Sequence, residues 1–229
     1  TIIVLGGHLN DLRMQTQERI DEGVLGAPSR HLIETSAGQL GPIGVGLWHK
    51  NKIIPATTTA GDFSGPFADK FGVKLDVGTT VIFTIKKHTG VMAALVDWIT
   101  SQHYLDPSEG KVLSKPMLLI DDEADYASIN TKSQKEEVTL TNQLIRQILS
   151  LFSKSTYVAY TATPFANVFI DPDENSYSEH DDLFPSDFMI KMPVPTNYMG
   201  QEFFFGDTVL RNELNATSPL IEIHDHLPI

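Results

Sequence analysis

The feature that most constrains the fold is a series of short, largely apolar runs without a strict alternation of polar residues. The clearest runs are residues 1–5 (TIIVL), 79–85 (TTVIFTI), 116–120 (PMLLI) and 156–162 (TYVAYTA). Such runs are typical of strands that are covered on both faces, as in parallel sheets. Segments with helical spacing separate them. We therefore expect an α/β fold over residues 1–165, built as a doubly wound parallel sheet.

Helices are expected between these strands. Asn10 or Asp11 is placed to cap a helix that runs through residues 12–20. Residues 91–99 have helical spacing, with one face formed by Met92, Leu95, Val96 and Ile99. Residues 139–154 predict another helix, with a stripe formed by Leu140, Leu144, Ile148, Leu151 and Phe152.

The composition excludes several classes of protein. The chain has 229 residues and no cysteine, which excludes a disulfide scaffold, a cysteine-ligated zinc site and a cysteine nucleophile. No apolar run reaches the roughly 20 residues of a membrane-spanning helix, and no signal peptide opens the chain. The net charge of −12 argues against a generally basic nucleic-acid surface but not against a local basic groove. These observations favour a cytoplasmic protein that has no membrane partner.

The two ends of the chain differ in pattern. Residues 1–170 hold the alternating strands and helices, and residues 171–229 begin with an acidic run. Acidic polar runs are usually solvated loops. We therefore expect residues 171–229 to form an acidic loop and a C-terminal extension of the same domain.

Acidic residues gather where the run at 116–120 ends. Asp121, Asp122, Glu123 and Asp125 follow it directly. Ligands of α/β proteins bind beyond the carboxyl ends of the strands, and carboxylate oxygens suit a hard cation such as Mg²⁺. Asp122 is placed to hold magnesium and Glu123 to polarise a water molecule, whereas Asp121 has no evident role. The alternative is an acidic strand-to-helix turn in which a carboxylate caps a helix.

Two motifs carry a resemblance to known families. Asp122-Glu123-Ala124-Asp125 and Thr161-Ala162-Thr163-Pro164 resemble the second and third motifs of the superfamily-two helicase ATPases. The wider frame DDEADYASIN, YTATPFANVF and DLFPSDF resembles the "Z-one" domain family of bacterial endonuclease-type proteins, which carries a helicase-like ATPase core. This resemblance covers about residues 1–205 and implies a RecA-like sheet of the P-loop NTPase type.

The resemblance implies a role for each matched residue. Asp122 would be the magnesium ligand, and Glu123 would be the general base. Three residues would couple the nucleotide state to nucleic-acid binding: Asp125, Thr161 and Thr163. Nucleic-acid contacts would come from Asn10, Arg13, Gln15, Lys86 and Lys87. For the basic and polar residues the alternative is an exposed helix surface or a solvated strand end. DNA is the implied partner, and Mg²⁺ and ATP are the implied cofactors.

The phosphate-binding loop of such ATPases is missing from the sequence. No GxxxxGK[ST] pattern occurs, and Gly110-Lys111 is followed by Val112 where Ser or Thr is required. The resemblance places that loop before the run at 1–5 and a second RecA-like lobe after the last residue. We therefore expect a truncated lobe of a restriction or defence enzyme, inactive alone but part of an ATP-hydrolysing parent.

Two further functions remain open. A nuclease domain with its own metal site would use Glu109-Gly110-Lys111 together with Asp97 upstream. Residues 109–111, however, lie in a Pro/Ser/Gly loop rather than on a strand. His224-Asp225-His226 could ligate a metal, but a solvated tail explains it as well. The other possibility is a degenerate lobe that binds or regulates without hydrolysis.

Overall fold

The structure is a computed structural model that describes part of the chain. The described residues are 1–30, 43–44, 53–75, 78–103, 105–126, 140–164, 183, 187–193 and 195–198. The chain divides into two compact units, Thr1–Ser186 and Asp187–Ile229. All helices and strands given below belong to the first unit. The described residues of the second unit form no helix or strand, and they are exposed.

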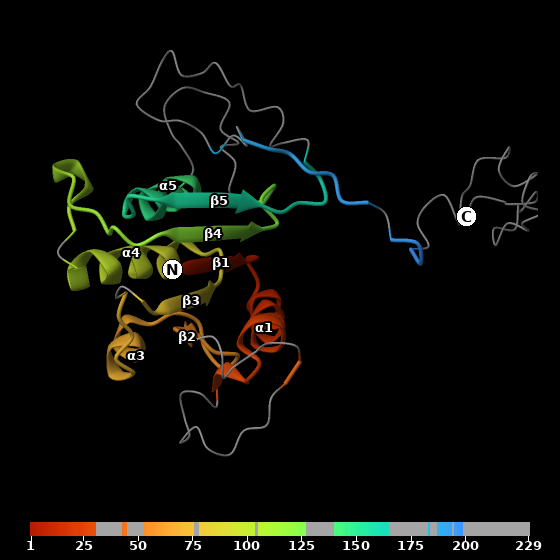
Figure 1. The fold of residues 1–229 in the computed structure, drawn as a ribbon, viewed down its shortest axis with the longest axis horizontal. Coiled ribbons are helices and arrows are strands. Elements are labelled where there is room, and N and C mark those ends of the chain that lie inside the picture. Colours follow the sequence, from red (N-terminus) through yellow and green to blue (C-terminus); the bar gives the residue numbers. More distant parts are fainter. Residues whose placement is uncertain are drawn as a thin grey trace, which may run out of the picture. The chain divides into compact units, whose positions relative to one another are not determined.

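The first unit is built on a parallel sheet. Its strands are β1 (Ile2–Gly6), β2 (Ile53–Pro55), β3 (Thr80–Ile85), β4 (Met117–Asp122) and β5 (Ser155–Ala159). They lie in the order β2-β3-β1-β4-β5, and every neighbouring pair is parallel, as the row of arrows in Figure 1 shows. The expected α/β fold with a parallel sheet is confirmed, and each apolar run expected to be a strand is one.

Helices connect the strands. They are α1 (Asn10–Ile20), α3 (Gly65–Lys70), α4 (Thr89–His103) and α5 (Leu140–Ser150), with a π-helical turn at Asp21–Leu25 and a 3-10 turn at Pro107–Glu109. The face predicted for α4 is buried in full. The helix α1 begins at Asn10, so Asn10 and Asp11 lie inside it and neither is the expected cap; the N-cap is Leu9, and no side chain caps the helix.

The core lies on both faces of the sheet. On one face, alternate strand residues such as Leu5, Phe83 and Leu119 pack with apolar side chains of α3, α4 and α5. On the other face, Val4 and Ile82 pack with Leu25 at the end of the π-helical turn. Because neighbouring strand residues point to opposite faces, the two clusters confirm that helical segments cover both sides.

The half of the sheet at β4 and β5 is less covered. Leu118, Ile120 and Asp122 of β4 are only half-buried, and β5 is exposed or half-buried along its length. The strand β5 stands at one end of the strand order. Leu140, predicted to belong to the buried stripe of α5, is 56% exposed because it is the first residue of the helix.

Among the residues that the structure describes, no helix is long and apolar enough to cross a membrane.

Candidate functional site

The parallel register brings three strand ends to one rim of the sheet. Gly6 at the end of β1 lies opposite Asp122, and Ala159 at the end of β5 lies opposite Asp121. Since side chains alternate along a strand, Asp121 and Asp122 point to opposite faces. Asp121 is fully buried on the face of α4 and α5, whereas Asp122 is half-buried on the less covered face. The two adjacent carboxylates therefore have different surroundings.

Asp121 forms a buried ion pair. Its Oδ1 lies 2.6 Å from Nζ of Lys87, and both side chains are 0% exposed. Its Oδ2 accepts a hydrogen bond of 2.7 Å from the hydroxyl of Tyr157 on β5. A buried carboxylate is costly unless it is paired and hydrogen-bonded, and here both oxygens have partners. Asp121, whose role the sequence did not reveal, is the structural anchor of the acidic turn.

Lys87 was expected to contact nucleic-acid phosphate, and its placement corrects that expectation. Its ammonium donates to the backbone carbonyls of Asp122 and Glu123, both at 2.8 Å, and of Tyr126 at 3.3 Å. An ammonium has three hydrogens, which match these three carbonyls, while Asp121 faces the ammonium as the partner of an ion pair. The side chain is directed inward beneath the acidic turn, because buried carbonyls require donors.

The backbone turns sharply at Glu123. Its φ is 53°, in the left-handed region, where a residue with a side chain is strained by about 1–3 kcal/mol. Its amide donates to Oδ1 of Asp122 at 3.2 Å. The turn is held to β5 because the amide of Ala124 donates to the carbonyl of Tyr160 and the amide of Tyr160 donates to that of Asp121. A strained residue at a rim crowded with carboxylates is typical of a functional site.

Asp125 joins the acidic turn to the segment after β5. Its two oxygens accept from the hydroxyls of Thr161 at 2.7 Å and Thr163 at 2.5 Å. The amide of Thr163 donates in turn to the hydroxyl of Thr161 at 2.9 Å. The hydrogen bonds from Thr163 and Thr161 lower the pKa of Asp125 below its ordinary value. The resemblance assigned a coupling role to these three residues, which stays a prediction, and the structure brings their side chains into contact.

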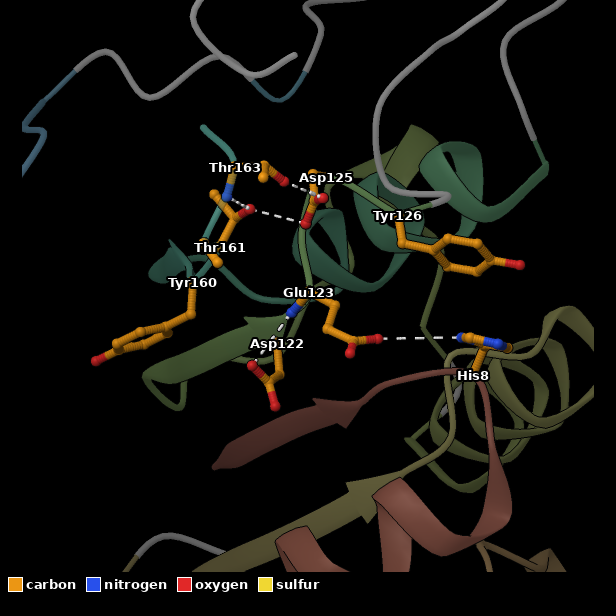
Figure 2. Close-up of a pocket in the computed structure, with 9 residues that line it drawn as sticks. His8, Asp122, Glu123, Asp125, Tyr126, Tyr160, Thr161 and Thr163 are labelled. Atoms are coloured by element: carbon orange, nitrogen blue, oxygen red, sulfur yellow. Dashed lines mark hydrogen bonds and ion pairs between the residues drawn. The ribbon is translucent and has the colours of Figure 1, made fainter. Parts of the chain in front are cut away.

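These residues line an open pocket. Its volume is about 670 Å³, and it is lined by His8, Asp122, Glu123, Asp125, Tyr126, Tyr160, Thr161, Ala162 and Thr163. In Figure 2 the rings of Tyr126 and Tyr160 lie on opposite sides of the carboxylates. Among the residues that the structure describes, no lysine or arginine lines the pocket, so its carboxylates would attract a cation.

The residue His8 faces Glu123 across the pocket. Its Nδ1 lies 4.0 Å from Oε2 of Glu123, and its ring stacks on that of Tyr126 at 4.3 Å between centroids (Figure 2). Gly7 before it has a φ of 63°, and a Cβ there would lie 3.1 Å from Leu12 and 3.4 Å from Glu123. Glycine at this position therefore allows the turn of β1 to approach the acidic turn.

The pocket supplies carboxylates but not a complete set of metal ligands. Among the described residues, no group of three or more His, Asp or Glu side chains could hold a metal ion alone. Magnesium is usually bound by one or two carboxylates together with phosphate oxygens and water. Asp122 and Glu123 at the mouth of a hollow of this size match that donor set.

The other residues expected to contact nucleic acid are placed differently from one another. Arg13 is only 4% exposed, and its guanidinium donates to the carbonyls of Thr58, Thr59 and Thr84. Its expected surface contact is therefore corrected, because the guanidinium ties α1 to the loop after β2. Lys86 donates to Oδ1 of Asn10 at 2.9 Å on the exposed surface, and Gln15 is exposed on α1.

The residues of the nuclease alternative do not converge on a metal site. Glu109 ends a 3-10 turn, and its Oε2 forms an ion pair of 2.5 Å with Nζ of Lys111. Asp97 is exposed on α4. The lysine therefore pairs with the glutamate in a loop, as the Pro/Ser/Gly composition predicted. His224, Asp225 and His226 lie outside the described residues.

Several pocket residues were not singled out in the sequence. His8, Tyr126 and Tyr160 line the pocket together with the predicted acids and threonines. One signal could have found two of them, because His8 and Tyr160 follow shortly after the ends of β1 and β5. The position of Tyr126 depends on the left-handed turn at Glu123, which no sequence pattern indicates.

Comparisons of the chain with protein-family models, with curated proteins and with solved structures each found no match. The resemblance to helicase-like families therefore depends on the motifs alone. The functional argument depends on the geometry of the pocket.

Proposed function

We propose that this chain is a RecA-like lobe that takes part in magnesium-dependent ATP hydrolysis in a helicase-like or translocase-like enzyme acting on DNA, of the restriction or defence type. The observation that carries the proposal is the pair of hydrogen bonds from Thr161 and Thr163 to Asp125. The two motifs were matched to helicases separately, and in the helicase pattern they act as one unit. Their direct contact is the arrangement that this pattern requires.

Each acidic residue has a distinct proposed role. Magnesium, when bound, would neutralise developing charge on the transferred phosphate. Asp122 would hold the ion, since its carboxylate is half-buried beside the pocket. Glu123 would orient and deprotonate the attacking water, since its carboxylate is 46% exposed and faces the hollow. Asp121 is excluded from this chemistry because it is buried in the ion pair with Lys87.

The threonines would relay nucleotide state to the DNA-binding parts of the enzyme. Their hydroxyls can donate and accept, so they can exchange Asp125 for another partner. The hydrogen bond from the amide of Thr163 to the hydroxyl of Thr161 would couple the two residues in such an exchange. Asn10 and Lys86, joined on the surface at the end of β3, remain candidates for phosphate contact with DNA.

A phosphate cradle would come from a segment of this sequence without the GxxxxGK[ST] pattern, or from residues outside this sequence. The exposed strand β5 is placed for such a segment, because it stands at the end of the strand order and leads into Thr161. The lack of the GxxxxGK[ST] pattern in this sequence favours a second candidate function. Without a cradle, the lobe would bind or regulate without hydrolysing ATP.

ATP hydrolysis by the longest natural protein that contains this chain, measured with and without DNA, tests the proposal. Glu123→Gln removes the proposed base, and we expect kcat to fall by about 10²–10⁴-fold. Asp122→Asn should raise the magnesium concentration that half-saturates the reaction. Glu109→Gln is the matched control, because Glu109 lies outside the pocket and pairs with Lys111. Unchanged turnover in Glu123→Gln would refute the assignment and favour the non-hydrolysing lobe.

A further inference from the structure

We infer that Lys87 is a positioning residue that sets the conformation of Glu123 and joins the turns after β1 and β4 into one site. The inference rests on the proposed function only where it calls Glu123 the residue that activates water. Lys87 does not reach the pocket, and its ammonium acts through backbone carbonyls. It holds the backbone from which the carboxylate of Glu123 extends.

The directions of the backbone carbonyls of Asp122 and Glu123 show how Lys87 acts on the turn. In an extended strand, successive carbonyls point to opposite sides, so one ammonium cannot bind two in a row. Lys87 binds the successive carbonyls of Asp122 and Glu123, each at 2.8 Å. Glu123 has a φ of 53°, outside the extended region, so the chain turns between the two carbonyls and both can face the ammonium. The ammonium therefore compensates the strain of the left-handed residue.

The ion pair explains why this ammonium stays in place. Lys87 and Asp121 are both 0% exposed and their charged atoms are 2.6 Å apart. Asp121 is in turn fixed by its hydrogen bond from Tyr157 on β5. A buried lysine that left its carboxylate would leave an unpaired charge in the core. The position of the ammonium is thus set by the core and not by solvent.

The backbone of Lys87 reaches the second turn. Its amide donates to the carbonyl of Gly7 at 2.7 Å. The next residue, His8, stacks on Tyr126 and faces Glu123. Lys87, just after β3, therefore holds the turn that follows β1 through its amide and the turn that follows β4 through its side chain. This double contact accounts for the approach of His8 to Glu123.

The test is a variant that removes the ammonium without leaving a buried charge. Lys87→Met alone would leave Asp121 unpaired and could unfold the chain. The double variant Lys87→Met/Asp121→Asn removes both charges and keeps an acceptor for the hydroxyl of Tyr157. Lys111→Met is the matched control, because it removes an exposed lysine that also pairs with an acid.

The readout is the conformation of Glu123 in the whole chain, measured by NMR. The coupling between the amide and α protons and the Cα chemical shift together report the sign of φ. We expect positive φ in the wild type and in Lys111→Met, and negative φ in the double variant, with strand chemical shifts unchanged. Positive φ in the folded double variant would overturn the inference, as would failure of a folded wild type to show it.

A second readout separates positioning from stability. In the longest natural protein that contains this chain, the double variant should lower kcat by about 10²-fold and leave KM for ATP nearly unchanged. An unchanged kcat in a double variant that has lost positive φ would overturn the positioning role. If Glu123→Gln also leaves turnover unchanged, the proposed function fails, and the conformational readout alone decides the inference for the turn.

Discussion

The rim of the sheet has two parts with opposite character. The acidic rim consists of Asp122, Glu123, Asp125, Thr161 and Thr163, and its side chains converge on one open pocket. The basic rim consists of Asn10, Arg13, Gln15, Lys86 and Lys87, and its side chains separate: two are buried inward, and three are at the surface. Both parts lie near carboxyl ends of strands or in the helix that follows, so position alone does not explain the difference.

Side-chain length and hydrogen-bonding capacity explain it. A short carboxylate or hydroxyl at a strand end points where its Cβ points, which is toward the pocket for Asp122 and into the core for Asp121. A long basic side chain carries several donors and can turn back to satisfy buried carbonyls. Lys87 and Arg13 each do so, with three backbone carbonyls apiece. A basic residue at a ligand-binding rim is therefore weaker evidence for ligand contact than an acidic one.

The largest expected effect separates the two neighbouring lysines of the basic rim. Lys87→Met should lower the free energy of unfolding by roughly 3–5 kcal/mol, because it leaves Asp121 as an uncompensated buried charge. Lys86→Met should change it by less than about 0.5 kcal/mol, because its contact with Asn10 is exposed. Urea denaturation measures both. Equal effects would mean that Lys87 is not a core residue.

Arg13 and Gln15 give the next contrast, on one helix. Arg13→Met should cost about 2–3 kcal/mol, since it leaves buried carbonyls of Thr58 and Thr84 without their donor. Gln15→Met should cost less than about 0.5 kcal/mol at an exposed position. DNA binding by the same variants sharpens the comparison. If the folded Arg13→Met variant bound DNA more weakly than the wild type, Arg13 would contact the nucleic acid after all.

A smaller, pH-dependent effect belongs to the acidic rim. The pKa of Asp125 is lowered by hydrogen bonds from Thr163 and Thr161, so these bonds favour the ionised form. Their contribution to stability is present above the ordinary pKa of aspartate and is lost as the pH falls through the lowered pKa. The double variant Thr161→Val/Thr163→Val should raise the pKa of Asp125, measured by carboxyl-carbon NMR titration.

Asp106 provides the control for that titration. Its pKa is also lowered, chiefly by a hydrogen bond from Ser108, and it lies in the loop beyond α4. The threonine variants should leave its titration unchanged. A pKa of Asp125 that does not move would show that the hydrogen bonds to Thr161 and Thr163 do not form in solution.

The sequence predicted the framework better than the side-chain directions. Continuous apolar runs marked the long strands, and strand ends placed the acids and threonines at one rim, because a parallel register is set by burial. The inward turn of Lys87 could not be predicted, since it depends on a left-handed residue at Glu123 and on the pairing of β3 with β1. The exposure of Leu140 likewise depends on where α5 begins, which helical spacing does not specify.

Binding of Mn²⁺, used as a probe for Mg²⁺, tests the central claim most directly. Electron paramagnetic resonance of this chain measures the free ion, and line broadening of backbone amides locates the bound one. Binding should be weak, because Asp122 and Glu123 would act without phosphate oxygens, and ATP should strengthen it where a cradle is present. Broadening centred on residues 122–125 that Asp122→Asn abolishes and Asp106→Asn, in the exposed loop beyond α4, retains is the predicted result. No broadening there, or broadening that survives Asp122→Asn, would contradict the assignment of the acidic rim as a metal site.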